Sequence, residues 1–309
     1  MRTVFLGTPA FAVPTLERMV QAGHEVLLAV TQPDRPRGRG RQLAPPPVKE
    51  AALRLGIEVY QPERVRRPEA VARLRELAPD VMVVVGYGQI IPQSVIDIPR
   101  LGIINVHASL LPKYRGAGPV QWAIVNGETL TGVTTMRIDA GLDTGDMLLK
   151  RETGIGADET SVEVADRLSE MGADLLVETL AGLEAGTIAA EKQDDSLATH
   201  APIINKEDGL IDWSQSAQAI HNRVRGFQPW PGAFTIFRGH PLHIWRSRPH
   251  TARGTAGAIV STKPLTIACG EGALELIEVQ AEGRKRMSAA DFANGQHIAE
   301  NETVGEARS

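Results

Sequence analysis

The sequence predicts a two-domain α/β protein, in which a mainly parallel sheet is followed by a smaller, antiparallel β domain. Three observations support this prediction. The chain has 309 residues, more than a single hydrophobic core usually organises. Its first two thirds alternate apolar strand-like runs with helical patterns, whereas its last third holds short β-like runs at close spacing. We expect a first domain at residues 1–186, a linker at 187–205 and a second domain at 206–309.

The elements expected in the first domain are apolar runs that end at glycine, proline or polar residues. Strands are expected at residues 2–7, 25–31, 57–61, 81–88 and 102–106, and helices at 11–23, 49–56, 67–79 and 119–127. The later runs 131–139 and 146–152 are expected to pair, and a long amphipathic helix is expected at 159–186. Because alternating strands and helices give parallel strands with crossovers, ligands are expected beyond the carboxyl ends of the strands.

The second domain has a different rhythm. A helix at 216–227 precedes five short β-like runs at 233–239, 241–247, 257–262, 265–270 and 273–279. Glycine and proline separate these runs, a pattern typical of a small antiparallel barrel or sandwich. A last helix is expected at 287–295, with a capping box from Ser288 to Asp291.

Composition excludes several classes of protein. No apolar run approaches the roughly 18 residues of a membrane span, and the start of the chain lacks the pattern of a secretory signal. The single cysteine, Cys269, excludes an internal disulfide framework and a multi-cysteine metal site, so we expect a cytoplasmic protein. The net charge of −4 argues weakly against a nucleic-acid partner, although the segment PDRPRGRGRQLAPPPVK is strongly basic.

Candidate catalytic residues lie at the end of the predicted strand GIINV. Asn105 and His107 are two residues apart and therefore project toward the same face of the strand. An amide and an imidazole can both donate to a developing oxyanion, and the imidazole can also move protons. The downstream segment IDAGLDTGDML offers Asp139, Asp143 and Asp146 as partners for the histidine. From the spacing alone, an alternative is that Asn105 and His107 bond backbone groups while the acidic loop is simply solvated.

The motifs that would indicate other chemistries are missing from the sequence. It contains no GxSxG, HExxH or P-loop motif, and GTPAF lacks the glycines of a dinucleotide-binding turn. Carbonyl polarisation without a covalent enzyme intermediate remains, which suits direct acyl transfer between two bound substrates.

The segment NVHASLLPKYRGAGPVQWAI, followed by GLDTGD, resembles the folate-dependent formyltransferases. That family has an asparagine, a histidine two residues later, a leucine–proline turn and a downstream aspartate. Asn105, His107 and Asp143 match its catalytic positions. Its folate-binding turn is matched by SLLP, which is Ser109, Leu110, Leu111 and Pro112. The resemblance implies 10-formyltetrahydrofolate as formyl donor and no metal.

The resemblance covers essentially the whole chain, and is to those members of the family whose acceptor is initiator methionyl-tRNA. It includes FLGTPAFAVPTLERM, the basic segment and KEDGLIDWSQSAQAIHNRVRGFQPWPGAF. It implies a Rossmann-like formyltransferase fold for the first domain and an OB-fold-like barrel for the second. We also expect a monomer that binds folate and tRNA and does not associate with a membrane.

Basic residues supply candidate tRNA contacts, because arginine suits phosphate oxygens and glycine lets a backbone approach them. The candidates in the basic segment are Arg35, Arg37, Arg39, Arg41 and Lys49. In the second domain a phosphate track competes evenly with solvated surface at Arg223, Arg225, Arg246, Arg248, Lys263, Arg284, Lys285 and Arg286. The aromatic residues Phe227, Trp230 and Phe234 are expected in a core or interface.

The expected reaction is attack of the methionine α-amine on the formyl carbon, with Asn105 and protonated His107 stabilising the oxyanion and Asp143 supporting the imidazolium. Two other functions remain as alternatives: formylation of a small amine, and a non-catalytic RNA-binding module. The basic segment and second domain argue against the first alternative, and the complete set of three catalytic residues argues against the second.

Overall fold

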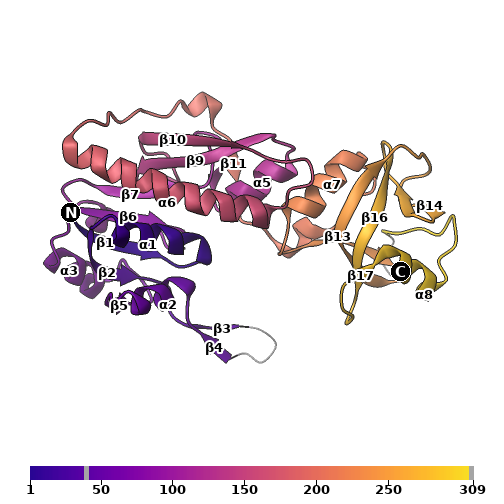
Figure 1. Ribbon diagram of the computed structural model, residues 1–309, viewed down its shortest axis with the longest axis horizontal. Helices are drawn as coiled ribbons and strands as arrows, with labels where there is room; N and C mark the ends of the chain where they lie inside the picture. The colour runs from indigo at the N-terminus through magenta and orange to yellow at the C-terminus, as the bar shows by residue number, and fades with distance from the viewer. Residues whose placement is uncertain (38–41, 306–309) are drawn as a thin grey trace. The chain divides into compact units, whose positions relative to one another are not determined.

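A computed structural model describes residues 1–37 and 42–305. The chain divides into two compact units (Figure 1). The first unit comprises Met1–Gly116, Thr131–Gly154 and Ala165–His200, and the second comprises Ala117–Leu130, Ile155–Val164 and the chain from Ala201 onward. In the described part of the chain, no helix combines the length and apolar character needed to cross a membrane.

The first unit is built on a seven-stranded sheet in the order β10-β9-β7-β6-β1-β2-β5. Its strands are β1 (Arg2–Gly7), β2 (Glu25–Val30), β5 (Val59–Tyr60), β6 (Val81–Val85), β7 (Ile103–His107), β9 (Leu130–Arg137) and β10 (Met147–Gly154). The pairs β2–β5, β1–β2, β1–β6 and β6–β7 are parallel, whereas β9 runs antiparallel to β7. The predicted mainly parallel sheet and the pairing of its two late strands are therefore confirmed.

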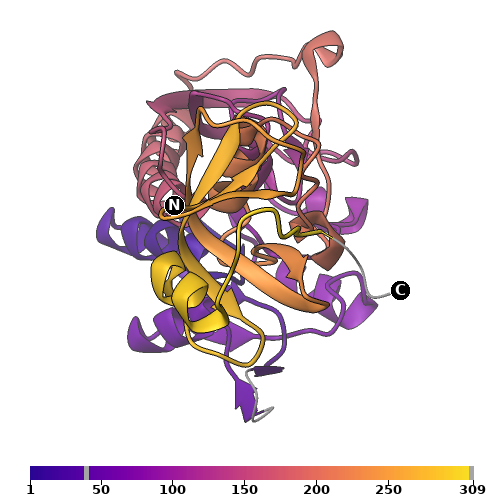
Figure 2. The same ribbon diagram turned by 90° about the vertical axis from the view of Figure 1, so that its right-hand side faces the viewer.

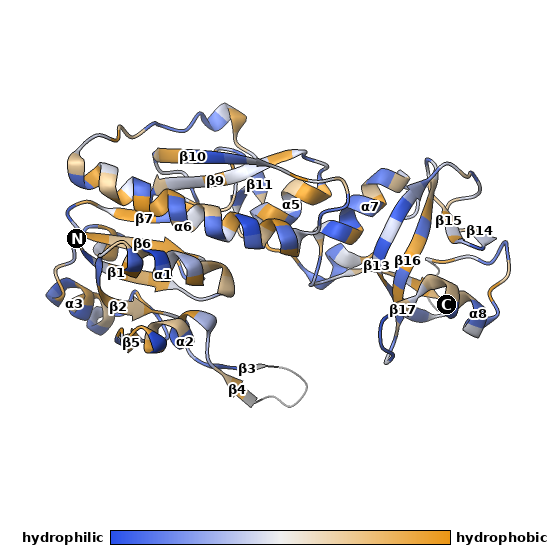
Figure 3. Cartoon of the chain, in the orientation of Figure 1, coloured by the Kyte–Doolittle hydropathy of each residue, from blue (hydrophilic) through white to orange (hydrophobic). Residues whose placement is uncertain are grey.

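Helices of the first unit begin where the sequence supplies proline or an extended residue. They are α1 (Val13–Gln21), α2 (Pro47–Arg54), α3 (Pro68–Glu76), α4 (Gln93–Ile96) and α6 (Ser161–Ala185), of which α6 starts in the second unit. Proline suits the first turn of α1, α2 and α3, because a backbone N–H in the first turn has no partner within the helix and proline therefore loses no hydrogen bond there. Strand β6 is buried along its whole length, as its sequence VMVVV predicts (Figure 3).

Several short elements were not predicted, because each is too short to show a hydrophobic period. They are strands β3 (Arg35–Arg37), β4 (Gln42–Ala44), β8 (Arg115–Gly116) and β11 (His200–Ala201), helix α4, and the 3-10 helices η1 (Ala10–Ala12), η2 (Asp195–Leu197) and η3 (Lys206–Gly209). Strands β3 and β4 pair antiparallel, so the described ends of the basic segment form a hairpin. Backbone bonds hold these elements without a large apolar face.

The second unit contains a six-stranded antiparallel sheet in the order β12-β13-β16-β15-β14, with β17 on β16. Its elements are α5 (Pro119–Val125), α7 (Ala217–Gly226), β12 (Ala233–Phe237), β13 (His240–His250), β14 (Ile259–Thr262), β15 (Leu265–Ala268), β16 (Ala273–Ala281), β17 (Met287–Ser288) and α8 (Ala289–Gln296). The chain after α8 bridges both ends of this order, because Val304 pairs with Phe237 of β12 and Thr303 pairs with Ala258 beside β14. The sheet therefore wraps into a barrel-like form.

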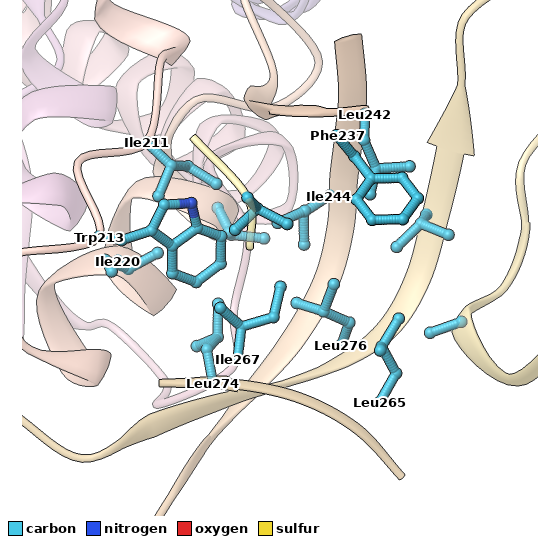
Figure 4. Close-up of a cluster of buried hydrophobic side chains, with 14 of the residues drawn as sticks. Ile211, Trp213, Ile220, Phe237, Leu242, Ile244, Leu265, Ile267, Leu274 and Leu276 are labelled. Atoms are coloured by element: carbon cyan, nitrogen blue, oxygen red, sulfur yellow. The ribbon is translucent and has the colours of Figure 1, made fainter. Parts of the chain in front are cut away.

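The barrel-like sheet encloses one hydrophobic core. Trp213, Ile244 and Leu274 lie within it (Figure 4). Phe292 of α8 belongs to the same core, and the strands that surround it can be followed in Figure 2. The Ser288 half of the predicted capping box is confirmed, since Ser288 Oγ accepts a hydrogen bond from Asp291 N at 3.0 Å, while Asp291 Oδ2 accepts from Ser288 Oγ at 2.7 Å. Phe227 is fully buried as expected, but Trp230 is 55% exposed, so its placement in a core was wrong.

Truncation in this core should lower stability. Leu274 is fully buried, so Leu274→Ala should lower the free energy of unfolding by about 2–5 kcal/mol through lost transfer free energy and the cavity left behind. Leu210, in the same unit, is 48% exposed, and Leu210→Ala should change it by no more than about 1 kcal/mol. Chemical denaturation of both variants measures the difference. Equal losses would mean that Leu274 does not carry the core packing seen here.

Candidate active site

Asn105 and His107 lie at the carboxyl end of β7, inside the sheet. Both point to one face of the strand, and both are nearly buried, with exposed fractions of 8% and 5%. Asn105 is in register with Val84 of β6 and with Met136 of β9. Because β7 is paired on both sides, the two side chains project from a fixed backbone rather than from a mobile loop.

The acidic loop between β9 and β10 brings one of its three aspartates to this pair. Asp143 Oδ1 accepts from Asn105 Nδ2 at 3.4 Å, and Asp143 Oδ2 lies 3.7 Å from His107 Nδ1. The other two aspartates have different surroundings. Asp139 accepts hydrogen bonds within the loop, from Gly141 N and Thr144 Oγ1, while Asp146 is exposed. The structure therefore selects Asp143 among the three candidates.

The two glycines of the acidic loop lie close to other atoms, which are backbone atoms at Gly145 and the Thr144 side chain at Gly141. A Cβ at Gly145 would lie 1.9 Å from Arg137 O, and a Cβ at Gly141 would lie 1.9 Å from Thr144 Oγ1. Neither approach tolerates a side chain. Asp143 itself has φ +52°, the left-handed region that non-glycine residues adopt at some cost. The loop thus directs a carboxylate inward through a backbone conformation that its surroundings must maintain.

The turn after β7 supplies two backbone partners that the sequence did not reveal. His107 Nε2 lies 2.9 Å from Tyr114 O, and Gly116 N donates to Asp143 Oδ2 at 2.9 Å. Because a carbonyl oxygen only accepts, Nε2 carries the hydrogen in this arrangement. A second proton would then reside on Nδ1, where it faces the Asp143 carboxylate. The imidazolium form of His107 would therefore have an acceptor for each of its N–H groups.

The SLLP turn is largely buried. Ser109 and Leu111 are both about 1% exposed, whereas Leu110 and Pro112 are partly buried. Ser109 Oγ donates to Lys113 O at 2.6 Å, and Thr134 Oγ1 links Ser109 O to Leu111 N. These bonds fix the shape of the turn. A ligand at this turn would therefore meet its main chain and the side chains of Leu110 and Pro112.

The basic segment follows β2, which lies three strands from β7 in the sheet order, or about 14 Å at ordinary strand spacing. Arg35 is exposed. Lys49 is not free, because its Nζ contacts both oxygens of Asp34 at 2.7 and 2.9 Å. Arg39, Arg41 and the side chain of Arg37 lie outside the described residues.

A cleft of about 350 Å³ lies beside the hairpin at the carboxyl ends of the central strands. Its lining includes Thr8 after β1, Gln32 after β2, Gly88 after β6, and Arg35 of the hairpin. Thr8 Oγ1 and Gln32 Nε2 both donate to Tyr87 O, at 3.0 and 3.1 Å, which ties the three strand ends together. This cleft lies at the edge of the sheet where ligands of parallel α/β domains bind.

The basic residues of the second unit fall into two groups. Arg225 is buried and donates to the carbonyls of Gly156 and Glu159, and Arg223 bonds Asp208 O, so both hold the backbone of their own unit. The remaining candidates are exposed: Arg246, Arg248, Lys263, Arg284, Lys285 and Arg286. A phosphate track that includes Arg223 and Arg225 is therefore not supported.

Family models match both parts of the chain. Residues 1–180 match the model described as "Formyl transferase", and residues 203–297 match "Formyl transferase, C-terminal domain". Relatives with the name methionyl-tRNA formyltransferase align over nearly their full length. The protein of Solibacter usitatus is 72% identical over 308 residues, covering 99% of both chains, and that of Koribacter versatilis is 59% identical over 298 residues, covering 96% of both.

Solved structures share the fold at low sequence identity. An N-formyltransferase from Helicobacter canadensis, in complex with folinic acid and dTDP-3-aminofucose, has a TM-score of 0.67 and 18% identity, covering 90% of this chain and 98% of its own. HypX from Aquifex aeolicus, in complex with tetrahydrofolic acid, has a TM-score of 0.65 and 17% identity. That match covers all of this chain but only 51% of HypX, so this chain spans about half the length of HypX.

Proposed function

Because this chain belongs to the formyl transferase family, we propose that it transfers the formyl group of 10-formyltetrahydrofolate to the α-amino group of initiator methionyl-tRNA. The observation that carries this proposal is the convergence of Asn105, His107 and Asp143 in a chain 72% identical, over nearly its whole length, to a methionyl-tRNA formyltransferase. The product, N-formylmethionyl-tRNA, serves translation initiation, and we place the protein in the cytoplasm as a monomer.

In the proposed reaction the neutral amine of the methionyl ester attacks the formyl carbon. One N–H of the Asn105 amide is directed to Asp143, and the other N–H donates to the developing oxyanion. His107 Nε2 exchanges Tyr114 O for the same oxygen when the substrates bind. Each preorganised donor contributes about 3 kcal/mol to the transition state. No covalent intermediate with the enzyme is required.

Asp143 has two roles in this scheme. Its carboxylate faces His107 Nδ1 and stabilises the imidazolium. The same carboxylate relays the proton of the attacking amine, directly or through water, to the folate nitrogen. The carboxylate is only partly exposed, which strengthens its interaction with the ring relative to bulk water. The folate is held at the turn from Ser109 to Pro112, through its main chain and its half-buried side chains.

The basic hairpin is proposed to bind the acceptor end of the tRNA. Arg35 lines the cleft at the carboxyl ends of β1, β2 and β6. If the hairpin binds phosphates of the acceptor end, the terminal nucleotide would lie near the sheet edge that carries Asn105. Arg37, Arg39 and Arg41 continue the same basic run in the sequence. Lys49, already paired with Asp34, should contribute little.

Removal of the charges of the basic segment should weaken use of tRNA. Changing Arg35, Arg37, Arg39 and Arg41 to glutamine should lower kcat/KM for charged tRNA at least tenfold at low salt. It should also make the log–log salt dependence shallower, since each lost phosphate contact removes roughly 0.7–0.9 from the slope. The KM for folate should stay within about twofold. Arg75→Gln, at an exposed arginine near the end of α3, is the control for loss of a positive charge elsewhere on the first unit, and should leave the salt slope unchanged. An unchanged salt slope would contradict the assignment.

The function itself is tested by formyl transfer with purified components. Methionine-charged initiator tRNA, methionine-charged elongator tRNA and small amine acceptors are each incubated with 10-formyltetrahydrofolate and the enzyme. Selective modification of the initiator species is the expected result. Transfer to a small amine alone would preserve the chemistry and overturn the acceptor, and an absence of transfer to all three would indicate a binding module.

A further inference from the structure

The segment Gln193–Thr199, here called the strap, belongs to the first unit and holds the turn that follows β7. It lies within the stretch 187–205, which the sequence predicts to be a linker. Tyr114 N donates to Thr199 Oγ1 and Arg115 N donates to Thr199 O, both at 2.9 Å. Since Tyr114 O is the partner of His107 Nε2, the strap supports the histidine through one intervening residue.

Gln193 supports the aspartate more directly. Its side chain is 4% exposed, and Nε2 donates to Asp143 O and Gly145 O, each at 2.8 Å. Its Oε1 accepts from Arg115 Nε at 3.0 Å. The orientation of the amide is unambiguous, because two carbonyls can only accept and a guanidinium can only donate. A flipped amide would lose all three bonds, because it would set its oxygen against the two carbonyls and its N–H groups against the guanidinium.

Two consecutive residues of the turn therefore hold Asp143 from opposite ends. Gly116 N binds its carboxylate, while Arg115 holds Gln193, which binds its backbone carbonyl. Arg115 is itself buried, and its other contact is with Asp195 of the strap at 2.8 Å. The side chains of Asp195, Arg115 and Gln193 are thus connected by hydrogen bonds. These bonds give partners to a buried guanidinium and a buried amide, as buried polar groups require.

The backbone of Asp143 needs such a restraint. Its φ of +52° is costly for a residue with a side chain, so the loop would relax toward commoner conformations if it were not held. The bond from Gln193 to Asp143 O holds the peptide unit that follows the φ torsion of Asp143, and the bond to Gly145 O holds the loop two residues further on. Relaxation would turn the carboxylate away from His107 Nδ1.

We propose that Gln193 is a positioning residue for formyl transfer, which holds the Asp143 loop in its active conformation from outside the loop. The inference rests on the proposed function of Asp143. Gln193 contacts backbone carbonyls of the loop, so its loss should affect the reaction step rather than substrate binding. A displacement of about 1 Å in a reacting group can cost about a hundredfold in rate.

Two variants test this role. Gln193→Glu keeps the length of the side chain and an acceptor for Arg115, but replaces the two N–H donors with a carboxylate oxygen facing two carbonyls. Gln193→Ala removes every bond. Both should lower kcat roughly 10- to 100-fold, with KM for folate and for charged tRNA within about twofold of the wild type. Both variants should lose stability, because each leaves the two buried carbonyls without donors, so kcat is measured at a temperature at which circular dichroism shows both variants to be folded.

Leu197→Ala, an exposed position of the same strap, is the matched control and should retain wild-type kcat. Asp143→Asn and the wild type are assayed beside it. A kcat within threefold of wild type in either Gln193 variant would overturn the proposal, as would a loss explained by a raised KM or by unfolding in both. Wild-type inactivity, or full activity of Asp143→Asn, would instead show that the proposed function or the role of Asp143 has failed.

Discussion

Asp143→Asn should lower kcat for formyl transfer about a thousandfold while leaving the protein folded. Asparagine has nearly the same size, and its carbonyl oxygen can still accept the bond from Gly116 N. What it lacks is the negative charge 3.7 Å from His107 Nδ1 and the capacity to take a proton. A factor of a thousand corresponds to about 4 kcal/mol in the activation free energy.

The measurement is single-turnover formyl transfer with saturating folate and charged tRNA, so that product release does not mask the chemical step. Circular dichroism and the unfolding midpoint check that the variant is folded. Asp146→Asn is the matched control, because Asp146 is an exposed carboxylate at the end of the same loop. If Asp143→Asn kept a tenth or more of the wild-type rate, the carboxylate would have no part in proton transfer.

The convergence of Asn105 and His107 at the carboxyl end of a parallel strand, the proposed active site, could be predicted from the sequence because it depends on short-range patterns. Apolar runs ending at glycine located the parallel strands, and a spacing of two residues placed Asn105 and His107 on one face of β7. The resemblance in GLDTGD then chose Asp143 from three aspartates that spacing alone left open. These inferences need only local periodicity and a match of residue types.

The supports of the site could not be predicted, because they join residues distant in the chain through polar bonds that leave no periodic trace. Arg115 and Gln193 are separated by 78 positions. The stretch that contains Gln193 is polar and without periodicity, which led to its interpretation as a linker. Composition also cannot separate a buried arginine such as Arg225 from an exposed one such as Arg246. Burial is decided by packing that the sequence does not display.

The structure also refines the expected role of the imidazole. The sequence predicts that His107 faces a substrate oxyanion, yet in this structure its Nε2 is directed to Tyr114 O. Hydrogen bonds of a catalytic group often take their reactive geometry only once substrate is bound. In the proposed reaction the backbone carbonyl would hold the ring with its Nε2–H already oriented as a donor, before that N–H turns to the formyl oxygen.

His107→Ala should lower kcat by about a thousandfold or more, since it removes an oxyanion donor and the cationic partner of Asp143 together. Asn105→Ala should cost less, about a hundredfold, because only one donor is lost. His107→Gln keeps a donor of similar reach and should recover part of the loss, although it cannot carry a proton. The same single-turnover assay measures all three, with KM for folate expected within about threefold of wild type.

The double variant Asn105→Ala, His107→Ala decides whether the two residues act on one oxygen. Groups that stabilise the same oxyanion share its charge, so removing both should cost clearly less than the product of the single losses. A strictly multiplicative loss would mean that the two side chains serve separate steps. A rate for His107→Ala within tenfold of wild type would remove the imidazole from the mechanism, and Asn105 and the Asp143 carboxylate would then have to account for catalysis without it.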